Sequence, residues 1–217
     1  YNYLGTFNRI SGTKNRLFYQ IYYQHKKGDG YRENSNFKQN QIFAEIGYHI
    51  SENAKIGLEY THMNYLARQA GGLTDLNFIE DPRQSVRNRN WFNINWNMLA
   101  LNYDQEIGNK SSINIRAFGM ISQRNSLGFL GKITQADNND IREMIASDFK
   151  NGGIELRFLK KYILKRKKSE SNNKRVIKGA ILCGMRYYEG NTSAKQGLAT
   201  YGNNPDFSFQ NENDLES

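Results

Sequence analysis

One stretch decides the fold of this chain, Leu66–Met98, which reads LARQAGGLTDLNFIEDPRQSVRNRNWFNINWNM. It begins at the end of one segment of alternating apolar and polar residues and finishes inside another. Between them lies a polar excursion of about twenty residues, a length that is uncommon in compact domains and usually functional. Its charged residues are Arg68, Arg83, Arg87 and Arg89 with Asp75, Glu80 and Asp81. A long charged loop between two strands indicates a binding loop on a rigid sheet.

The composition favours strands over helices. The 217 residues include 14 Tyr and 12 Phe but only 2 Pro, and the mean hydropathy is −0.79. Aromatic and β-branched residues without the apolar periodicity of helices are typical of β-sheets. No apolar run approaches the roughly 18 residues of a membrane-spanning helix, which excludes a helical membrane protein. A membrane β-barrel stays open, because its strands are apolar only at alternate positions.

The chain lacks the residue patterns of enzymes and metal sites. Cys183 is the single cysteine, so an intrachain disulfide and a multi-cysteine metal site are excluded. His25, His49 and His62 are scattered and lack metal-ligand spacing. The sequence contains no nucleophile–base–acid order, P-loop or dinucleotide fingerprint. We therefore predict no enzymatic activity, no catalytic residue, no bound metal and no cofactor.

The net charge of +9 comes almost entirely from one place. Residues 160–178 hold nine basic residues and one acid, which leaves 21 basic against 20 acidic residues elsewhere. A basic turn at the ends of two strands explains this better than a nucleic-acid surface, and contact with anionic lipid or phosphate is the alternative. We predict no nucleic-acid partner.

Eight segments alternate apolar and polar residues as half-buried strands do. They cover residues 1–8, 16–24, 41–50, 55–61, 92–98, 113–124, 154–158 and 176–188. The fifth loses its phase at residues 99–101, which a β-bulge or burial on both sides would explain. Residues 141–149 have the composition of a short helix inside a second long loop, 125–151. The last stretch, 189–217, has the composition of a loop.

Connections between these segments alternate between shorter and longer, so one end of the sheet carries turns and the other carries loops. Each segment has one apolar face and one face with charges such as Glu59, Arg116 and Glu155. A soluble sandwich would bury the apolar faces against a second sheet. Strands of about ten residues with this pattern instead indicate an antiparallel transmembrane β-barrel with short periplasmic turns and long extracellular loops. An interfacial aromatic girdle would then fit Trp91, Trp96, Tyr65 and Tyr187, and aromatics packed inside the protein are the equal alternative.

Several short motifs, in colinear order, resemble the barrel of TonB-dependent outer-membrane receptors, and most closely those of the iron(III) dicitrate type. They are residues 28–35 (GDGYRENS), 70–75 (AGGLTD), 81–85 (DPRQS), 89–92 (RNWF), 124–129 (RNSLGF), 206–209 (DFSF) and 213–216 (NDLE). The resemblance implies a 22-stranded barrel with an N-terminal plug, energised by an inner-membrane TonB-type complex. Residues 1–217 would supply about eight strands of that barrel and no plug, as an internal piece of a longer chain.

The resemblance also implies a location, a partner and a cargo: the outer membrane of a Gram-negative bacterium, its lipid, and a ferric chelate such as iron(III) dicitrate. Such a chelate is a carboxylate-rich anion, which the planar guanidinium of arginine binds through paired hydrogen bonds. The candidate ligands are Arg83, Arg87 and Arg89 in the long loop, Arg68 and Arg124 at strand ends, and Gln69, Gln84 and Gln123. Solvation or local pairing of these arginines with Asp75, Glu80 and Asp81 is the competing interpretation.

Three alternatives to this receptor stay open from the sequence. The same receptor class would also accept another anionic siderophore or nutrient. A passive outer-membrane porin or a barrel enzyme would share the strand pattern but lack the plug. A soluble all-β binding module would bury the apolar rows in a core instead of exposing them to lipid.

Overall fold

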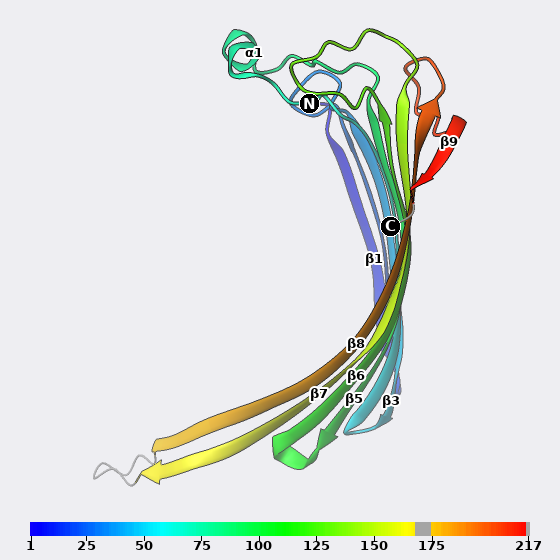
Figure 1. The fold of residues 1–217 in the computed structure, drawn as a ribbon. Helices are drawn as coiled ribbons and strands as arrows, with labels where there is room; N and C mark the ends of the chain where they lie inside the picture. The colour runs from blue at the N-terminus through cyan, green and yellow to red at the C-terminus, as the bar shows by residue number, and fades with distance from the viewer. Residues whose placement is uncertain (168–174, 216–217) are drawn as a thin grey trace.

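The computed structural model describes the backbone of residues 1–167 and 175–215, and the side chains of residues 1–163 and 178–211. Nine antiparallel strands form one open sheet in the order β1 to β9, with each strand paired to its neighbours in sequence (Figure 1). The strands are β1 Leu4–Lys14, β2 Leu17–Gly28, β3 Phe37–Ser51, β4 Ala54–Arg68, β5 Trp91–Ile107, β6 Ser111–Gly128, β7 Glu143–Lys167, β8 Arg175–Ala199 and β9 Phe209–Leu215. The prediction of an all-β antiparallel fold is confirmed.

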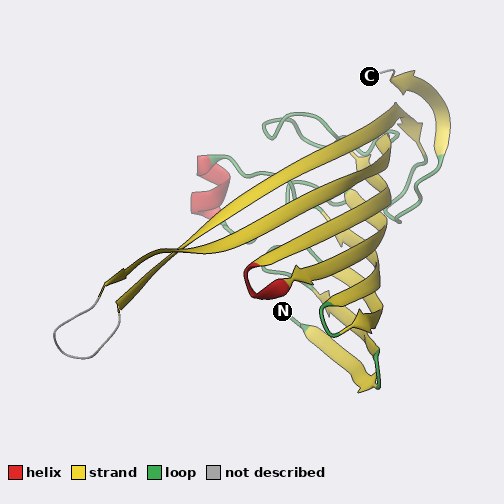
Figure 2. Cartoon of the chain, turned by 90° about the horizontal axis from the view of Figure 1, so that it is seen from below, coloured by secondary structure: helices red, strands yellow, loops and turns green. Residues whose placement is uncertain are grey.

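The described connections are short at one end of the sheet and long at the other, as Figures 1 and 2 show. At the short end, Asn15 takes a positive φ of 56° in the β1–β2 turn, a conformation that asparagine tolerates well. The 3₁₀ turn Gly108–Lys110 joins β5 to β6 and begins with Gly108 at φ 58°. The centre of the predicted basic turn, residues 168–174, lies outside the described residues.

Two local predictions from the sequence are wrong, and one short helix was not predicted. Residues 141–149 do not form a helix, because β7 begins at Glu143 and pairs with β6 and β8 along its length. The stretch 189–217 is not only a loop, because β8 continues to Ala199 and a ninth strand, β9, pairs with it. A short helix, α1 Asp75–Glu80, occurs instead in the first long loop, where Thr74 caps it by accepting a hydrogen bond from the Asn77 backbone N–H.

The sheet has two chemically different faces, which follow from the register of the strands. One face, here called the apolar-band face, carries rows of cross-strand neighbours that are largely hydrophobic. One such row runs Tyr19, Ile46, Leu58, Leu101, Ala117, Ile154 and Tyr187 from β2 to β8. On the opposite, charged face, Arg116 pairs with Glu59 at 3.2 Å and Arg186 pairs with Glu155 at 3.2 Å.

The apolar-band face changes to polar residues toward the long-loop end. A row near that end reads His25, Asn40, Asn64, Asn95, Gln123, Asp148 and Ser193. At the border, the Tyr23 hydroxyl donates to Asn40 (2.9 Å) and the Tyr60 hydroxyl donates to Asn97 (2.8 Å). The sheet therefore carries an apolar band that ends at a row of tyrosines and amides, as at a membrane–water interface.

This change of polarity explains why the alternation of the fifth segment loses its phase. The pairing of β5 with β4 and β6 continues without a register shift, so there is no bulge at residues 99–101. Leu99 and Leu101 face the apolar band, while Asn95 and Asn97 occupy the same face beyond the border. Two residues of the predicted aromatic girdle, Trp96 and Tyr65, lie on the charged face. Trp91 is buried on the apolar-band face, and Tyr187 lies within the apolar band.

The small hydrophobic core lies at the long-loop end, on the apolar-band face. Trp91, Leu127, Met144 and Ala199, from β5 to β8, are its buried members, and Phe207 and Phe209 pack against them from the last long loop and β9. Within the described residues, no helix is long or apolar enough to span a membrane.

Candidate functional site

Four long connections gather at one end of the sheet, and together they are here called the loop crown (Figure 1). They comprise residues 29–36, 69–90, 129–142 and 200–208. Each of these loops is tied to the next by an arginine that donates to backbone carbonyls. These four arginines, Arg32, Arg87, Arg89 and Arg142, are here called the clamp arginines.

Arg32 ties the first loop to the second. Its Nε and Nη2 donate to the carbonyl of Gln84 at 3.0 and 2.8 Å, and its Nη1 donates to the carbonyl of Gly71. Gly71 has a φ of 76°, and a Cβ there would lie 2.7 Å from the Arg87 side chain. The loop thus turns tightly enough at this glycine for two clamp arginines to approach its backbone.

Arg87 ties the second loop to the third and is only 4% exposed. Its Nη1 donates to the carbonyl of Gln135 at 2.9 Å, and its Nη2 donates to that of Lys132 at 2.8 Å. The guanidinium lies over the Phe129 ring, 4.6 Å from its centroid. Most donors of Arg87 are therefore occupied within the crown.

Arg89 makes the second link between the same two loops through an ion pair with Asp137. Its Nε donates to Asp137 Oδ2 at 3.1 Å, its Nη2 contacts Oδ1, and its Nη1 donates to the carbonyl of Asp140 at 2.7 Å. Burial alone would raise the pKa of Asp137. The hydrogen bond from Arg89, the backbone N–H of Asn139 and the nearby positive charges outweigh it and lower this pKa below its ordinary value.

Arg142 ties the third loop to the fourth and is fully buried. It donates to the carbonyls of Thr200 (2.8 Å) and Asn204 (2.6 Å) and to the Thr200 hydroxyl (2.9 Å). Burial lowers the pKa of Arg142, the cation of Arg89 lowers it further, and the carboxylate of Asp206 opposes this change. The guanidinium stays charged, because its ordinary pKa lies far above neutrality.

The other candidates in and beside the second loop have freer side chains. Arg83 is exposed, with its guanidinium 5.7 Å from the Tyr31 ring centroid. Arg68 donates to Asn34 Oδ1 at 2.9 Å and lies over the Trp91 ring. Gln84 donates through Nε2 to the carbonyl of Asn77 at 2.6 Å, which holds the end of α1.

Gln123 and Arg124 do not share a site, because neighbouring residues of a strand face opposite sides. Gln123 lies on the apolar-band face, where its Nε2 donates to Asp148 at 2.9 Å. Arg124 lies on the charged face and is exposed, with its guanidinium 5.5 Å from the Phe149 ring centroid. The structure thus separates the eight candidates. Arg87 and Arg89 clamp loops, whereas Arg83, Gln84 and the exposed Gln69 lie in the second loop of the crown. Arg68 and Gln123 lie on the apolar-band face of their strands, and Arg124 lies on the charged face.

A cavity of about 380 Å³ lies between the second and third loops. Its lining is mostly neutral and polar, including Asn77, Ser85, Asn88, Thr134 and Gln135. Such a surface offers amide and hydroxyl groups to a ligand, while the nearby Arg87 and Asp137 are engaged in holding the two loops together. In the described part of the chain, no three His, Cys, Asp or Glu residues converge as a metal site would require.

Sequence reasoning missed Arg32 and Arg142, which tie the crown together as much as Arg87 and Arg89 do. Asn90 was also missed, although it exchanges two 2.9 Å hydrogen bonds with the backbone of Phe129. Asn90 and Arg142 stand directly before β5 and β7, which is a weak signal in the sequence, whereas Arg32 lies inside its loop. Which carbonyl each one reaches depends on how distant loops meet.

The architecture is similar to that of a solved structure. The crystal structure of the ferric citrate transporter FecA in the unliganded form superposes with a TM-score of 0.72, at 18% sequence identity over 88% of this chain. The chain therefore has the β fold of part of that transporter. It spans 26% of the length of that transporter. No protein-family model matches the chain, and no curated protein matches it by sequence.

Three features of the sheet fit part of a barrel wall. Its strands are antiparallel, they follow one another in sequential order, and they carry turns at one end and long loops at the other. The sheet is open, with β1 and β9 at its edges, so it corresponds to a segment of a barrel wall. At 18% identity the likeness concerns the fold alone.

Proposed function

We propose that this chain is part of an outer-membrane receptor that takes up a ferric chelate, with iron(III) dicitrate as its first candidate cargo. One observation carries this proposal: a receptor-like barrel segment has an apolar band that ends at tyrosines and amides, just below a crown of long loops. In such a protein the band contacts the lipid of a Gram-negative outer membrane. The crown meets the cargo outside the cell.

In this proposal, the exposure of each guanidinium group indicates its role. Arg83 is exposed in the crown and Arg124 is exposed on the charged face of β6, and the described partners of both guanidinium groups are aromatic rings. They are the arginines we expect to bind the carboxylates of the chelate directly. Arg87 and Arg89 position the loops. Their donors become available to a cargo only if the second and third loops separate.

Uptake through such a receptor is driven, in this proposal, by a plug and a TonB-type inner-membrane complex. An energised receptor and a passive porin differ in their response when the inner-membrane proton gradient is collapsed. We expect uptake of labelled ferric dicitrate by cells making the complete protein to stop on addition of a protonophore. Uptake that continues unchanged would favour the porin.

Binding to the complete protein tests the cargo and its site together. Ferric dicitrate is compared with iron-free citrate and with an uncharged siderophore, by calorimetry in detergent. We expect the complete protein to bind ferric dicitrate selectively. Arg83→Ala and Arg124→Ala should each lower the affinity about tenfold, as expected for the loss of charge-assisted hydrogen bonds. Arg9→Ala is the matched control, because Arg9 lies outside the crown and bonds to Gln20. Tighter binding of another anionic chelate would change the cargo but retain the receptor.

A further inference from the structure

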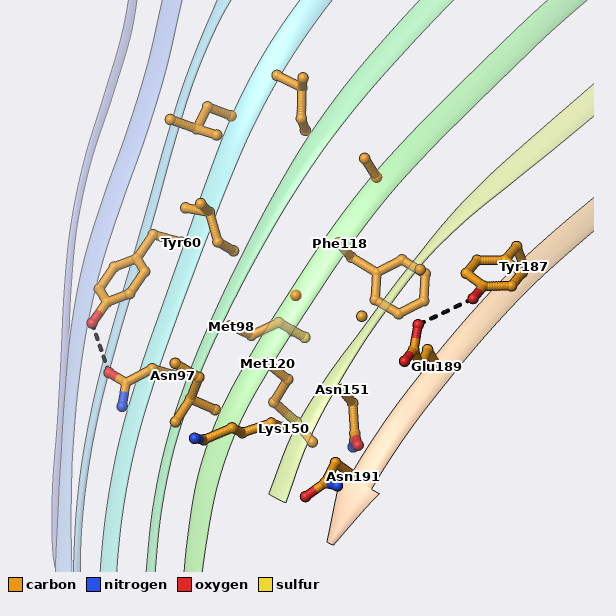
Figure 3. Close-up of a pocket in the computed structure, with 18 residues that line it drawn as sticks. Tyr60, Asn97, Met98, Phe118, Met120, Lys150, Asn151, Tyr187, Glu189 and Asn191 are labelled. Carbon is orange, nitrogen blue, oxygen red and sulfur yellow. Dashed lines mark hydrogen bonds between the residues drawn. The ribbon is translucent and has the colours of Figure 1, made fainter. Parts of the chain in front are cut away.

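The apolar-band face is not evenly filled, because it contains a hollow of about 880 Å³ (Figure 3). The hollow lies over a cross-strand pair of glycines, Gly119 on β6 and Gly152 on β7, which place no side chain on this face. Leu99, Leu101 and Ile121 are among its walls. Each of these three side chains is about half exposed, so the hollow is apolar and open to its surroundings.

The end of the hollow toward the crown is polar. Figure 3 shows Asn97, Lys150 and Asn191 along this end. Among the described residues, Lys150 forms no ion pair within 4.0 Å. The nearby carboxylates of Asp148 and Glu189 accept from Gln123 and from the Tyr187 hydroxyl, the latter at 3.0 Å. An exposed lysine that forms no ion pair thus stands at the border where the apolar band gives way to amides.

We infer that this hollow binds one lipid molecule of the surrounding membrane, with an acyl chain over Gly119 and Gly152 and a phosphate head group at Lys150. The inference rests on the proposed function, because it places the apolar band in a bilayer. Two observations support an acidic lipid: the hollow is continuous with the apolar band, and the ammonium group of Lys150, which forms no ion pair, stands at its polar end, while the Glu189 carboxylate in the lining accepts from Tyr187. Lysine at this height reaches head groups by extending its side chain along the apolar surface.

The glycines make the hollow testable without disturbing the sheet. A Cβ at Gly119 would lie 3.9 Å from the Asn151 carbonyl oxygen, and one at Gly152 would lie 3.4 Å from that of Phe118. Both distances are ordinary contacts, and valine suits strands better than glycine. Gly119→Val with Gly152→Val therefore fills the hollow in a folded protein. Gly57→Val is the matched control, because its Cβ would have equal room on the charged face, 3.8 Å from the nearest atom.

The experiment uses the complete protein in detergent and native mass spectrometry with two soluble probes, dioctanoyl phosphatidic acid and dioctanoyl phosphatidylcholine. We expect phosphatidic acid to bind more tightly to the unaltered protein. The double valine variant should bind both probes with at least about tenfold lower affinity, because several methylene contacts are lost. Lys150→Gln should lower the affinity for phosphatidic acid by about fivefold and leave that for phosphatidylcholine unchanged. Gly57→Val and Lys14→Gln, which removes an exposed lysine at the turn end, should change neither.

Three results would overturn the inference: unchanged binding in the double valine variant, equal loss in the Gly57→Val control, or displacement of phosphatidic acid by millimolar inorganic phosphate. The last result would show an anion site without a lipid chain. The single Gly119→Val variant should show an intermediate loss of affinity. It keeps the inference testable if the double variant misfolds. Flotation of the unaltered protein with vesicles separates the two proposals. A protein that does not float contradicts the proposed function, whereas one that floats but fails these tests contradicts only the lipid site.

Discussion

Arg89 and Asp137, 48 residues apart in sequence, form an ion pair that joins the two longest described loops of the crown. Their side chains are 5% and 6% exposed, so solvent screens this pair weakly. The remaining Nη1 donor of Arg89 is satisfied by the carbonyl of Asp140. A buried pair of this kind fixes the relative position of two loops, because breaking it leaves a charge without a partner.

We therefore expect Arg89→Ala to loosen the third loop without unfolding the sheet. Removing one partner of a buried pair costs about 3 kcal/mol, which corresponds to faster amide exchange in residues 129–142 by roughly a hundredfold. Hydrogen exchange with mass spectrometry measures this, with exposed Arg83→Ala as the control. The double variant Arg89→Ala with Asp137→Ala should lose less protection from amide exchange than the two single variants lose together. Equal exchange in Arg89→Ala and the unaltered protein would contradict this role of the pair.

Acid should open the same loop. The pKa of Asp137 is lower in the folded protein than in the unfolded chain, so its carboxylate contributes stability above the unfolded pKa of about 3.9. That stability is lost as the pH falls through the folded pKa. We expect protection of residues 129–142 to be constant above about pH 5 and to decline below pH 4. Asp137→Asn should lower protection near neutral pH and remove much of this decline, and an unaltered acid profile in that variant would count against the mechanism.

Arg142 should not be replaceable by lysine. A lysine keeps the charge, but it cannot reach the Thr200 and Asn204 carbonyls in the fork geometry of a guanidinium. We expect Arg142→Lys to release the fourth loop, which also accepts a 2.7 Å hydrogen bond from the Trp91 ring at the Asn203 carbonyl. The measurement is iodide quenching of Trp91 fluorescence in the complete protein, in a background in which Trp96 and any further tryptophan are phenylalanine, and we expect quenching to increase. Arg124→Lys, at an exposed arginine, should leave the quenching unchanged.

The border of the apolar band predicts a contrast between two lysine substitutions on one face of β5. Leu101 lies within the band and Asn95 lies beyond its border. If the band contacts lipid, Leu101→Lys should cost about 2–4 kcal/mol of folding free energy and Asn95→Lys about 0–1. Denaturant unfolding of the complete protein from vesicles measures both. Similar costs at the two positions would place the membrane border elsewhere.

Much of the fold was predictable because a strand half buried in an apolar medium leaves a signal with a period of two residues. Residues 16–24 and 41–50 alternate cleanly and form β2 and β3 at nearly those positions. The alternation also implied that Gln123 and Arg124 face opposite sides, although both were grouped as candidates. The signal fades in residues 92–101, because β5 runs from the polar region near the crown into the apolar band and its apolar side chains change face.

The sequence by itself determined the class of the sheet, the end at which its long loops gather, and the candidate arginines, because these depend on local alternation and on loop length. Only the tertiary structure decided which arginines hold loops and which remain exposed. Arg87 and Arg89 differ from Arg83 not in local sequence but in the carbonyl and carboxylate groups that another loop, 44 to 51 residues away, brings to them. Such contacts depend on how loops meet in space, and no short-range pattern in the sequence records them.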